Sequence, residues 1–265
     1  MRLSCRIRES VRGDGIMEKP FKHAKYYLAE NKRVGIVLFH AYTGSPNDHN
    51  LLARRLNREG YNVLVPRFKG HGTMEVFDIF KANTNDWLLD AREAIEWMLN
   101  QKFDFVFTFG LSLGGIFATK IMTEYGNKLT AGGVFNSPLV TSQPLDVEMF
   151  FMQYARYIYQ QNNELNQYTM DEDKIKEAYQ KQMYGINEFK QDLSNKLTKI
   201  TLPFYIAQSG QDEMIFPSDA YHLLSAMTNT EVVFNWFPNN THVITVNRER
   251  EHFERSLIEF IERYI

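Results

Sequence analysis

The chain alternates between short apolar runs and longer segments in which apolar residues recur every three or four positions. A short run with few charges is typical of a strand buried on both faces, and the three- and four-residue spacing is typical of an amphipathic helix. Strands are predicted at 33–39, 62–66, 103–109, 131–135, 203–207 and 232–237. Helices are predicted at about 51–60, 85–100 and 115–122, and from about 248 onward. This alternation predicts an α/β fold, with a mainly parallel sheet that helices cover on both faces.

A long insertion interrupts the alternation. About 65 residues of helical, aromatic and Met-rich sequence separate the strand that ends near Asn136 from the one that begins at Pro203, far more than an ordinary connection requires. We therefore expect an inserted cap at about 139–200, with two to four helices above the carboxyl ends of the strands. Most of its aromatic and Met side chains should hold the cap to the body, and the rest would suit the apolar roof of an acyl-binding pocket.

The amino-terminal residues differ in composition from the rest of the chain. Residues 1–16 are rich in Arg with scattered Gly and Ser, and Met17 begins a stretch that resembles a natural start. We expect residues 1–20 to be a disordered leader. Residues 21–265 should form one α/β domain that includes the cap, because domains of this class reach such a size.

Composition and charge exclude several classes of function. The net charge is −2 and the basic residues are dispersed outside residues 1–16, so neither nucleic acid nor an anionic membrane is expected as a partner. No apolar run reaches the ~18 residues that span a bilayer, and no secretory signal is present, so we expect a cytoplasmic protein without stable membrane insertion. Cys5 is the only cysteine, and no His or Glu cluster has the spacing of metal ligands. With no phosphate-binding loop either, no metal and no cofactor are expected.

The most informative motif is Gly110-Leu111-Ser112-Leu113-Gly114, which lies between a predicted strand and a predicted helix. A G-x-S-x-G pattern in this context is typical of the nucleophile elbow of serine hydrolases. The serine must adopt a strained backbone conformation to project its hydroxyl above the sheet, so side chains two residues away would collide. Glycine at both positions removes the collisions, and Ser112 is the predicted nucleophile.

A serine nucleophile needs a histidine base. In elbow-type hydrolases the histidine comes last in the chain, after the serine and the acid. His222 and His252 follow Ser112 but lie in helical patterns, where a solvated or structural role is the better interpretation. His242 follows a predicted strand in a loop, from which its ring can reach a serine at the top of the sheet. His242 is therefore the predicted base.

The base needs a carboxylate to orient it. Asp212 lies just past the predicted strand 203–207, so its side chain should point into the same crevice as the elbow. Its neighbour Glu213 is the competing candidate, whereas Asp219 is better placed to cap the next helix. We predict that Asp212 holds the histidine in one tautomer and stabilises the imidazolium as it forms.

Backbone N–H groups should complete the site. In hydrolases of this type, the loop after the first strand and the residue after the nucleophile bind the developing oxyanion. We assign these donors to Tyr42 and Leu113, and Leu113 also opens a helix whose N-terminus adds positive potential. His40 and His71 lie near the same loop and are interpreted as structural residues.

Five motifs together carry a family resemblance, at 40–44, 69–72, 110–115, 212–215 and 242–245. The region 33–265 resembles the bacterial carboxylesterase and monoacylglycerol lipase group of the α/β hydrolases. The resemblance implies the α/β-hydrolase fold, the triad and oxyanion donors named above, and short- to medium-chain acyl esters or monoacylglycerols as substrates. That group commonly has Gly-Phe where this chain has Ala41-Tyr42, and the extra hydroxyl bears on acyl selectivity.

The leading hypothesis is a serine esterase that forms an acyl-enzyme. A second reading keeps the triad and changes the acyl group, as in a feruloyl-type esterase, a peptidase or an acyltransferase, because fold alone does not select the substrate. A third is a small-molecule receptor on a hydrolase scaffold. The expected partner is a small ester, and the sequence leaves the oligomeric state open.

Overall fold

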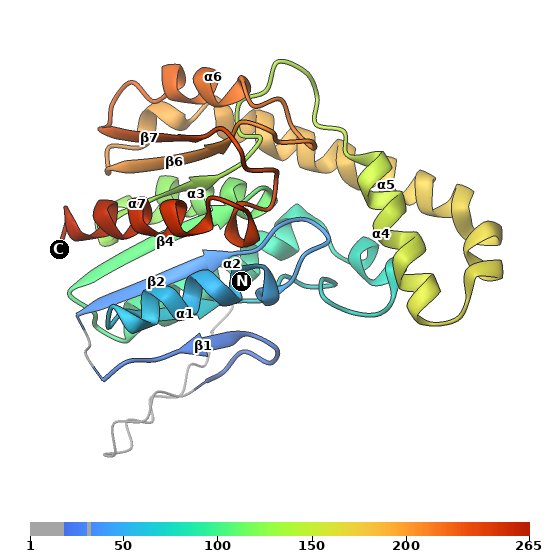
Figure 1. Cartoon of the computed structure of the whole chain (residues 1–265), viewed down its shortest axis with the longest axis horizontal. Helices are drawn as coiled ribbons and strands as arrows, with labels where there is room; N and C mark the ends of the chain where they lie inside the picture. Colours follow the sequence, from blue (N-terminus) through green and yellow to red (C-terminus); the bar gives the residue numbers. More distant parts are fainter. Residues whose placement is uncertain (1–18, 31–32) are drawn as a thin grey trace, which may run out of the picture.

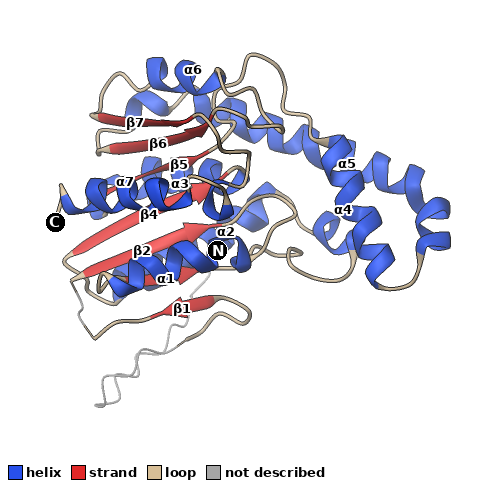
Figure 2. Ribbon diagram, viewed as in Figure 1, coloured by secondary structure: helices blue, strands red, loops and turns tan. Residues whose placement is uncertain are grey.

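The computed structural model describes residues 19–30 and 33–265, so most of the predicted leader lies outside the described residues. Within that part of the chain, the strands are β1 Lys25–Tyr27, β2 Val34–Phe39, β3 Asn62–Val65, β4 Phe105–Leu111, β5 Ala131–Phe135, β6 Phe204–Ser209 and β7 Val232–Phe237. They form one seven-stranded sheet in the order β1-β3-β2-β4-β5-β6-β7. β1 pairs antiparallel with β3 and the other pairs are parallel (Figure 2). The prediction of a mainly parallel sheet is confirmed.

The predicted strands all occur, but some of their bounds differ. β6 continues to Ser209, two residues beyond its predicted end. β4 begins two residues later than predicted and continues to Leu111, directly before Ser112. The shift arises because Lys102 turns the chain with φ of +61°, so pairing with β2 begins only at Phe105. Sequence reasoning missed β1, since three residues are too few to display a period.

Helices cover the sheet and connect its strands. The α-helices are α1 Asn50–Arg58, α2 Thr84–Asn100, α3 Leu113–Tyr125, α4 Glu148–Gln161, α5 Leu165–Ser194, α6 Asp219–Ala226 and α7 Arg250–Glu262. Short 3₁₀ helices are η1 Pro46–His49, η2 Val76–Lys81, η3 Gly126–Lys128, η4 Leu197–Lys199 and η5 Ile244–Val246. Among the described residues, none of these helices combines the length and the apolar character that crossing a membrane requires.

The sheet separates two apolar cores, because successive strand side chains point to opposite faces. On one face, α1 and α7 pack against side chains such as Ile36 and Phe109. On the other face, α2, α3 and α6 pack against Val37, Phe39 and Ile206. Figure 1 shows α1 and α7 together in front of the sheet and α2 and α3 behind it. The helices therefore cover both faces, as predicted.

The insertion between β5 and β6 contains α4 and α5, which pack against each other and extend away from the sheet on the side of the strands' carboxyl ends (Figure 1). Phe151 of α4 lies 5.2 Å from Tyr179 of α5, measured between ring centroids. The last turns of α5 return to the body, where Phe189 packs 5.3 Å from Phe117 of α3. The cap is thus anchored on the helix that begins at the elbow.

Candidate active site

Ser112 lies in the turn between β4 and α3, with φ of +52° and ψ of −118°. A Cβ at Gly110 would lie 2.1 Å from the backbone of Gly114, and a Cβ at Gly114 would lie 2.1 Å from the carbonyl oxygen of Phe39. Both distances are far shorter than carbon and oxygen atoms tolerate. A side chain at either position would therefore collide, as predicted. In both cases the collision would be with backbone atoms.

Two contacts hold the turn, one from the last residue of β5 and one from the second residue after β5. The Ser112 N–H donates to the carbonyl of Phe135 over 2.9 Å, and the Ser137 hydroxyl donates to the carbonyl of Ser112 over 2.8 Å. These bonds fix the backbone on either side of the serine side chain. Sequence reasoning missed Ser137, because its contact spans 25 positions.

The His242 ring and the Asp212 carboxylate form a buried pair. The Nδ1 atom lies 2.9 Å from Oδ1 and 2.8 Å from Oδ2, and the two side chains are 2% and 0% exposed. Oδ1 also accepts the N–H groups of Met214 and Ile215, each over 3.0 Å. A carboxylate on Nδ1 places the proton there and leaves Nε2 as the basic nitrogen. Nε2 is buried without a hydrogen-bond partner in the described part of the chain.

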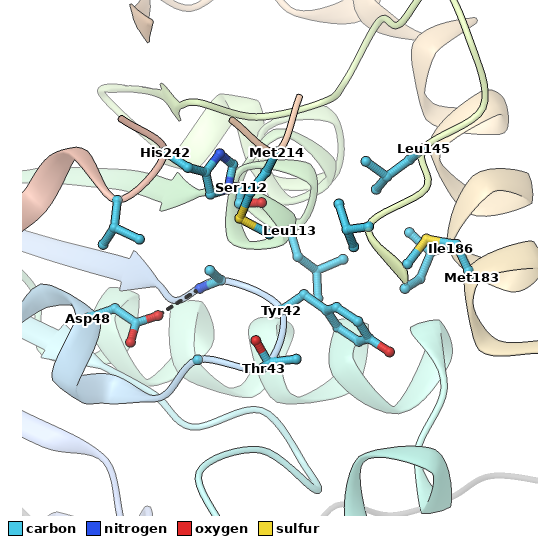
Figure 3. Close-up of a pocket in the computed structure, with 14 residues that line it drawn as sticks. Tyr42, Thr43, Asp48, Ser112, Leu113, Leu145, Met183, Ile186, Met214 and His242 are labelled. Carbon is cyan, nitrogen blue, oxygen red and sulfur yellow. Dashed lines mark hydrogen bonds between the residues drawn. The ribbon is translucent and has the colours of Figure 1, made fainter. Parts of the chain in front are cut away.

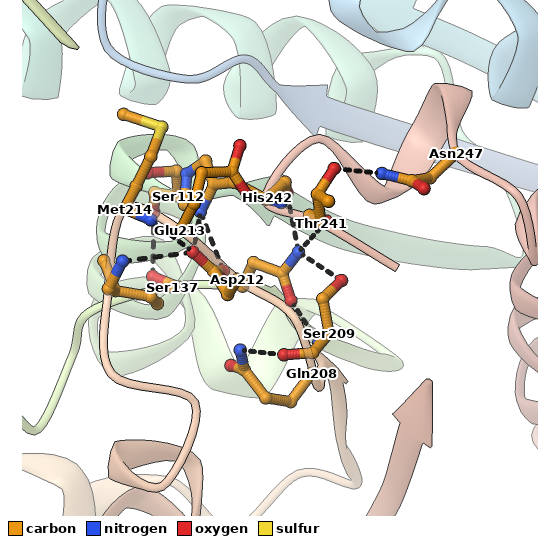
Figure 4. A network of polar contacts seen from close by, with 12 residues as sticks. Ser112, Ser137, Gln208, Ser209, Asp212, Glu213, Met214, Thr241, His242 and Asn247 are labelled. Atoms are coloured by element: carbon orange, nitrogen blue, oxygen red, sulfur yellow. Dashed lines mark hydrogen bonds and ion pairs between the residues drawn. The ribbon is translucent and has the colours of Figure 1, made fainter. Parts of the chain in front are cut away.

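Other contacts hold the backbone of the histidine. Its N–H donates to Glu213 Oε2 over 2.9 Å, so Glu213 binds the loop and not the ring. Its carbonyl accepts from the side chain of Asn136 over 2.6 Å, and Asn136 also binds the backbone and hydroxyl of Ser209. Figure 4 shows this network between the ends of β5 and β6 and the His242 loop. Asn136 was not singled out from the sequence, because its partners lie 73 and 106 positions away.

His40 and His71 are buried, and their contacts agree with the structural interpretation. His40 Nδ1 lies 2.9 Å from the carbonyl of Ala41, while Nε2 accepts the N–H of Phe68 over 3.1 Å. Burial holds the pKa of His40 well below its usual value and lowers the pKa of His71 to about 4. Both rings therefore stay neutral at pH 7 and tie the loop after β2 to the neighbouring turn.

The remaining histidines and acid candidates lie elsewhere. His222 is on α6, where its Nδ1 is 3.4 Å from Asp219, and its side chain is 56% exposed. His252 is on α7 and packs against Phe237. Asp219 is the first residue of α6, one position after the N-cap Ser218. The two histidines have the solvated and structural roles that the sequence suggested. Asp219 does not cap the helix as predicted, because its Oδ1 accepts the N–H of Ser142 over 3.3 Å.

A second carboxylate, partly buried, holds the loop after β2. Asp48 Oδ2 accepts the N–H of Ala41 and Oδ1 accepts the N–H of Ser45, each over 3.2 Å. The Ser45 side chain accepts from Asn47 in return, which makes a capping box at the start of η1. Burial raises the pKa of Asp48 to about 6. The serine–acid spacing of this box was the available signal for Asp48, which sequence reasoning did not use.

Four of the candidate residues line one cavity of about 180 Å³, namely Tyr42, Ser112, Leu113 and His242. Ser112 and His242 lie next to each other in both close-ups (Figures 3 and 4), and both line the cavity that Figure 3 shows. The lining residues are Ala41, Tyr42, Thr43, Gly44, Asp48, Ser112, Leu113, Leu145, Val147, Met183, Ile186, Met214, His242 and Val243. The cap and the segment leading into it supply the apolar wall opposite the elbow. In residues 19–30 and 33–265, no group of three or more His, Cys, Asp or Glu side chains is placed to hold a metal ion.

A mainly parallel sheet with helices on both faces, a strained serine between strand and helix, and a buried His–Asp pair beside that serine define an α/β hydrolase. The sequence model of the family described as serine aminopeptidase, S33, matches residues 30–249. The chain belongs to that family and is an enzyme of the hydrolase class.

Relatives by sequence include a carboxylesterase of Bacillus subtilis (strain 168), 24% identical over 86% of this chain and 92% of the relative. A thermostable monoacylglycerol lipase of Bacillus sp. (strain H-257) is 25% identical over 91% of this chain and 95% of its own length. Among solved structures, one from work on the metagenome-derived lipolytic enzymes LipS and LipT superposes with a TM-score of 0.72 at 20% identity, over 92% of this chain and 98% of that one. The resemblance to the carboxylesterase and monoacylglycerol lipase group is confirmed.

Proposed function

We propose that this hydrolase is a serine esterase that cleaves carboxylic acyl esters through an acyl-enzyme. The single observation that carries the proposal is the buried contact between Asp212 and His242 beside the cavity that Ser112 lines. That contact leaves Nε2 of the histidine free to take a proton from the serine hydroxyl. The sequence similarity to an esterase and a lipase supports the same reading.

The proposed reaction runs in two steps. The base takes the Ser112 proton as the serine oxygen attacks the ester carbonyl, and the tetrahedral intermediate collapses when His242 returns that proton to the leaving alcohol. Water then attacks the acyl-serine, with the same imidazole as its base, and the free acid leaves. Asp212 keeps Nδ1 protonated throughout and stabilises the imidazolium in each step.

We assign the stabilisation of the developing oxyanion to the backbone N–H groups of Tyr42 and Leu113. Both residues line the cavity beside Ser112. Leu113 is the first residue of α3, so its N–H is one of the donors that a helix start leaves without an intrahelical partner. The positive end of that helix would add to the stabilisation.

The cavity favours short to medium acyl chains. Its 180 Å³ is less than the roughly 300–1,000 Å³ of sites for drug-sized ligands. Leu145, Met183 and Ile186 form an apolar wall that suits alkyl chains, and the names of the two sequence relatives are consistent with simple esters or monoacylglycerols. Among the described residues that line the cavity, Tyr42 is the one aromatic. Alkyl esters are therefore better supported than feruloyl esters.

A series of p-nitrophenyl esters from acetate to palmitate tests the proposal, together with methyl ferulate and monobutyrin. We expect a maximum at short or medium chains and a loss of roughly 10⁶ in turnover for Ser112→Ala. Ser225→Ala, an exposed serine on α6, is the matched control and should retain wild-type turnover. Ser112→Ala with turnover within tenfold of wild type would refute the assignment. Turnover confined to methyl ferulate would favour the feruloyl alternative.

A further inference from the structure

The side chain of Tyr42 reaches from the loop after β2 into the cap. Its hydroxyl donates to Oε1 of Gln182, on α5, over 2.6 Å. Burial raises the pKa of this hydroxyl well above its usual value, so it remains a neutral O–H donor. The position is the one at which this chain has tyrosine where the resembling group commonly has phenylalanine. The hydroxyl therefore provides a contact that a phenylalanine would lack.

The amide of Gln182 makes further contacts. Its Nε2 atom donates to the carbonyl of Ile79, in η2, over 2.7 Å and to the carbonyl of Ala82 over 3.0 Å. Because Nε2 faces two carbonyl oxygens, the amide has only one orientation that satisfies all three bonds. One side chain thus ties together the cap helix, the η2 segment and the loop after β2.

Packing around the tyrosine ring leaves little freedom for that loop. The ring stacks on Phe151 of α4, with 5.5 Å between centroids and 27° between planes, and meets Trp87 of α2 edge-on at 6.3 Å. The side chain is held by both the body and the cap. Any shift of its hydroxyl must move the ring, and these contacts restrain the ring relative to the backbone whose N–H we assign to the oxyanion.

The turn of α5 that contains Gln182 also faces the cavity. Met183 follows Gln182 directly, and Ile186 lies one turn further along; both line the cavity (Figure 3). The position of this helix turn therefore determines where the apolar wall lies. It also determines where the acceptor of the Tyr42 hydroxyl lies.

We propose that Gln182 is a positioning residue for the oxyanion donor, acting through the hydroxyl of Tyr42, and that it couples the seating of the cap to that donor. The inference rests on the proposed function, because it assumes that the Tyr42 N–H binds the oxyanion. It gives the cap a part in the chemical step beyond enclosing the substrate. A donor that is off position weakens the transition state more than the ground state, so kcat falls while KM changes little.

Kinetics with p-nitrophenyl butyrate test this on Tyr42→Phe, Gln182→Met and the double variant. We expect each single variant to lower kcat about tenfold with KM within about twofold, since one displaced donor should lose less than a deleted one. The double variant should be no worse than the poorer single variant, because residues acting through one bond are not additive. Losses that multiply in the double variant would overturn the proposal.

Inhibition by butaneboronic acid separates positioning from simple loss of stability. The serine hydroxyl adds to boron and forms a tetrahedral adduct that resembles the intermediate. In both single variants we expect the inhibition constant to rise by the same factor by which kcat falls. An unchanged constant and an unchanged kcat in Tyr42→Phe would overturn the proposal, even if that variant melts earlier. Gln182→Met supplies the same readout if Tyr42→Phe folds poorly.

Asn162→Ala is the matched control. Asn162 joins the cap to the body through a 2.8 Å bond to the carbonyl of Met74, away from the cavity. The Asn162→Ala variant should have a lower melting temperature but unchanged kcat and boronate inhibition. A tenfold fall in kcat in this variant would show that any loosening of the cap lowers turnover, which would contradict a specific role of Gln182. Ser112→Ala in the same assay distinguishes the two proposals. If that variant is inactive and Tyr42→Phe is fully active, only the present inference fails.

Discussion

Both carboxylate oxygens of Asp212 lie within hydrogen-bond distance of Nδ1 of His242, at 2.9 and 2.8 Å. The next residue, Glu213, accepts the backbone N–H of the same histidine. Two adjacent carboxylates therefore bind different parts of His242. Asp212 binds the imidazole ring, and Glu213 binds the backbone N–H. This division yields a direct comparison between the two positions.

Asp212→Asn should lower kcat with p-nitrophenyl butyrate by about 10⁴, because an amide at this position favours the wrong imidazole tautomer. Glu213→Gln keeps an acceptor oxygen for the histidine N–H and should lose less than about tenfold. Steady-state rates of the two purified variants provide the measurement. If Glu213→Gln were the more damaged of the two, the acid would have to be reassigned to Glu213.

Gly110→Ala should destabilise the fold by about 3 kcal/mol or more, because the new Cβ would overlap backbone that has no room to move. Gly185→Ala is the matched control in the middle of α5, where a Cβ meets nothing within 4 Å. It should stabilise the protein by about 0.5–1 kcal/mol. Urea unfolding followed by circular dichroism measures both changes, and similar effects of the two substitutions would contradict the packing argument.

Asp48 predicts a pH-dependent stability. Burial raises its pKa to about 6 in the folded chain, from a usual value of 3.8. Between about pH 4 and pH 6 the folded chain holds a proton that the unfolded chain releases. The contribution of Asp48 to the free energy of unfolding therefore falls by about 3 kcal/mol as the pH rises through that window.

Asp48→Asn removes this dependence, because the amide does not titrate. The free energy of unfolding of the wild type, minus that of the variant, should thus be larger at pH 4 than at pH 7. Urea unfolding of both proteins at the two pH values measures the difference, and other buried groups cancel because both proteins contain them. A difference that stays constant with pH would show that the carboxyl is not perturbed by its burial.

The acyl-chain preference should respond to Ile186, which lines the cavity from α5. Ile186→Phe adds volume to the wall and should shift the optimum of the p-nitrophenyl series toward shorter chains, mainly through KM. Tyr184→Phe changes an exposed side chain of the same helix and should leave the profile unchanged. An unchanged profile for Ile186→Phe would place the acyl chain elsewhere.

Much of the candidate site could be read from sequence because its signals are local. The elbow occupies five consecutive residues, and its strand and helix flank it directly. Asp212 and His242 follow strand ends, and parallel strands bring their carboxyl ends to one edge of the sheet. The same reasoning predicts a structural role for His40, and its contacts with Ala41 and Phe68 agree with that role.

What sequence reasoning missed depends on contacts between distant segments. Asn136 binds a loop 106 positions away, and Tyr42 meets Gln182 across 140 positions. Neither pairing produces a periodic pattern or a short motif in the sequence, so the sequence alone does not indicate it. The cap illustrates the same limit. Its composition predicted helices whose aromatic side chains mostly hold the cap in place, but it did not indicate that Phe151 would pack on Tyr179 or which residues would line the cavity.

The double attachment of α5, through Gln182 to the loop after β2 and through Phe189 to α3, bears on how such enzymes are recombined. An inserted cap can be exchanged between related enzymes as one module, with the junctions at the points where the insertion leaves β5 and rejoins β6. In this chain such a graft would also discard the partner of the Tyr42 hydroxyl. A chimera that keeps residues 179–190 with the native body should preserve turnover, whereas one that replaces the whole insertion would need a new partner for the Tyr42 hydroxyl.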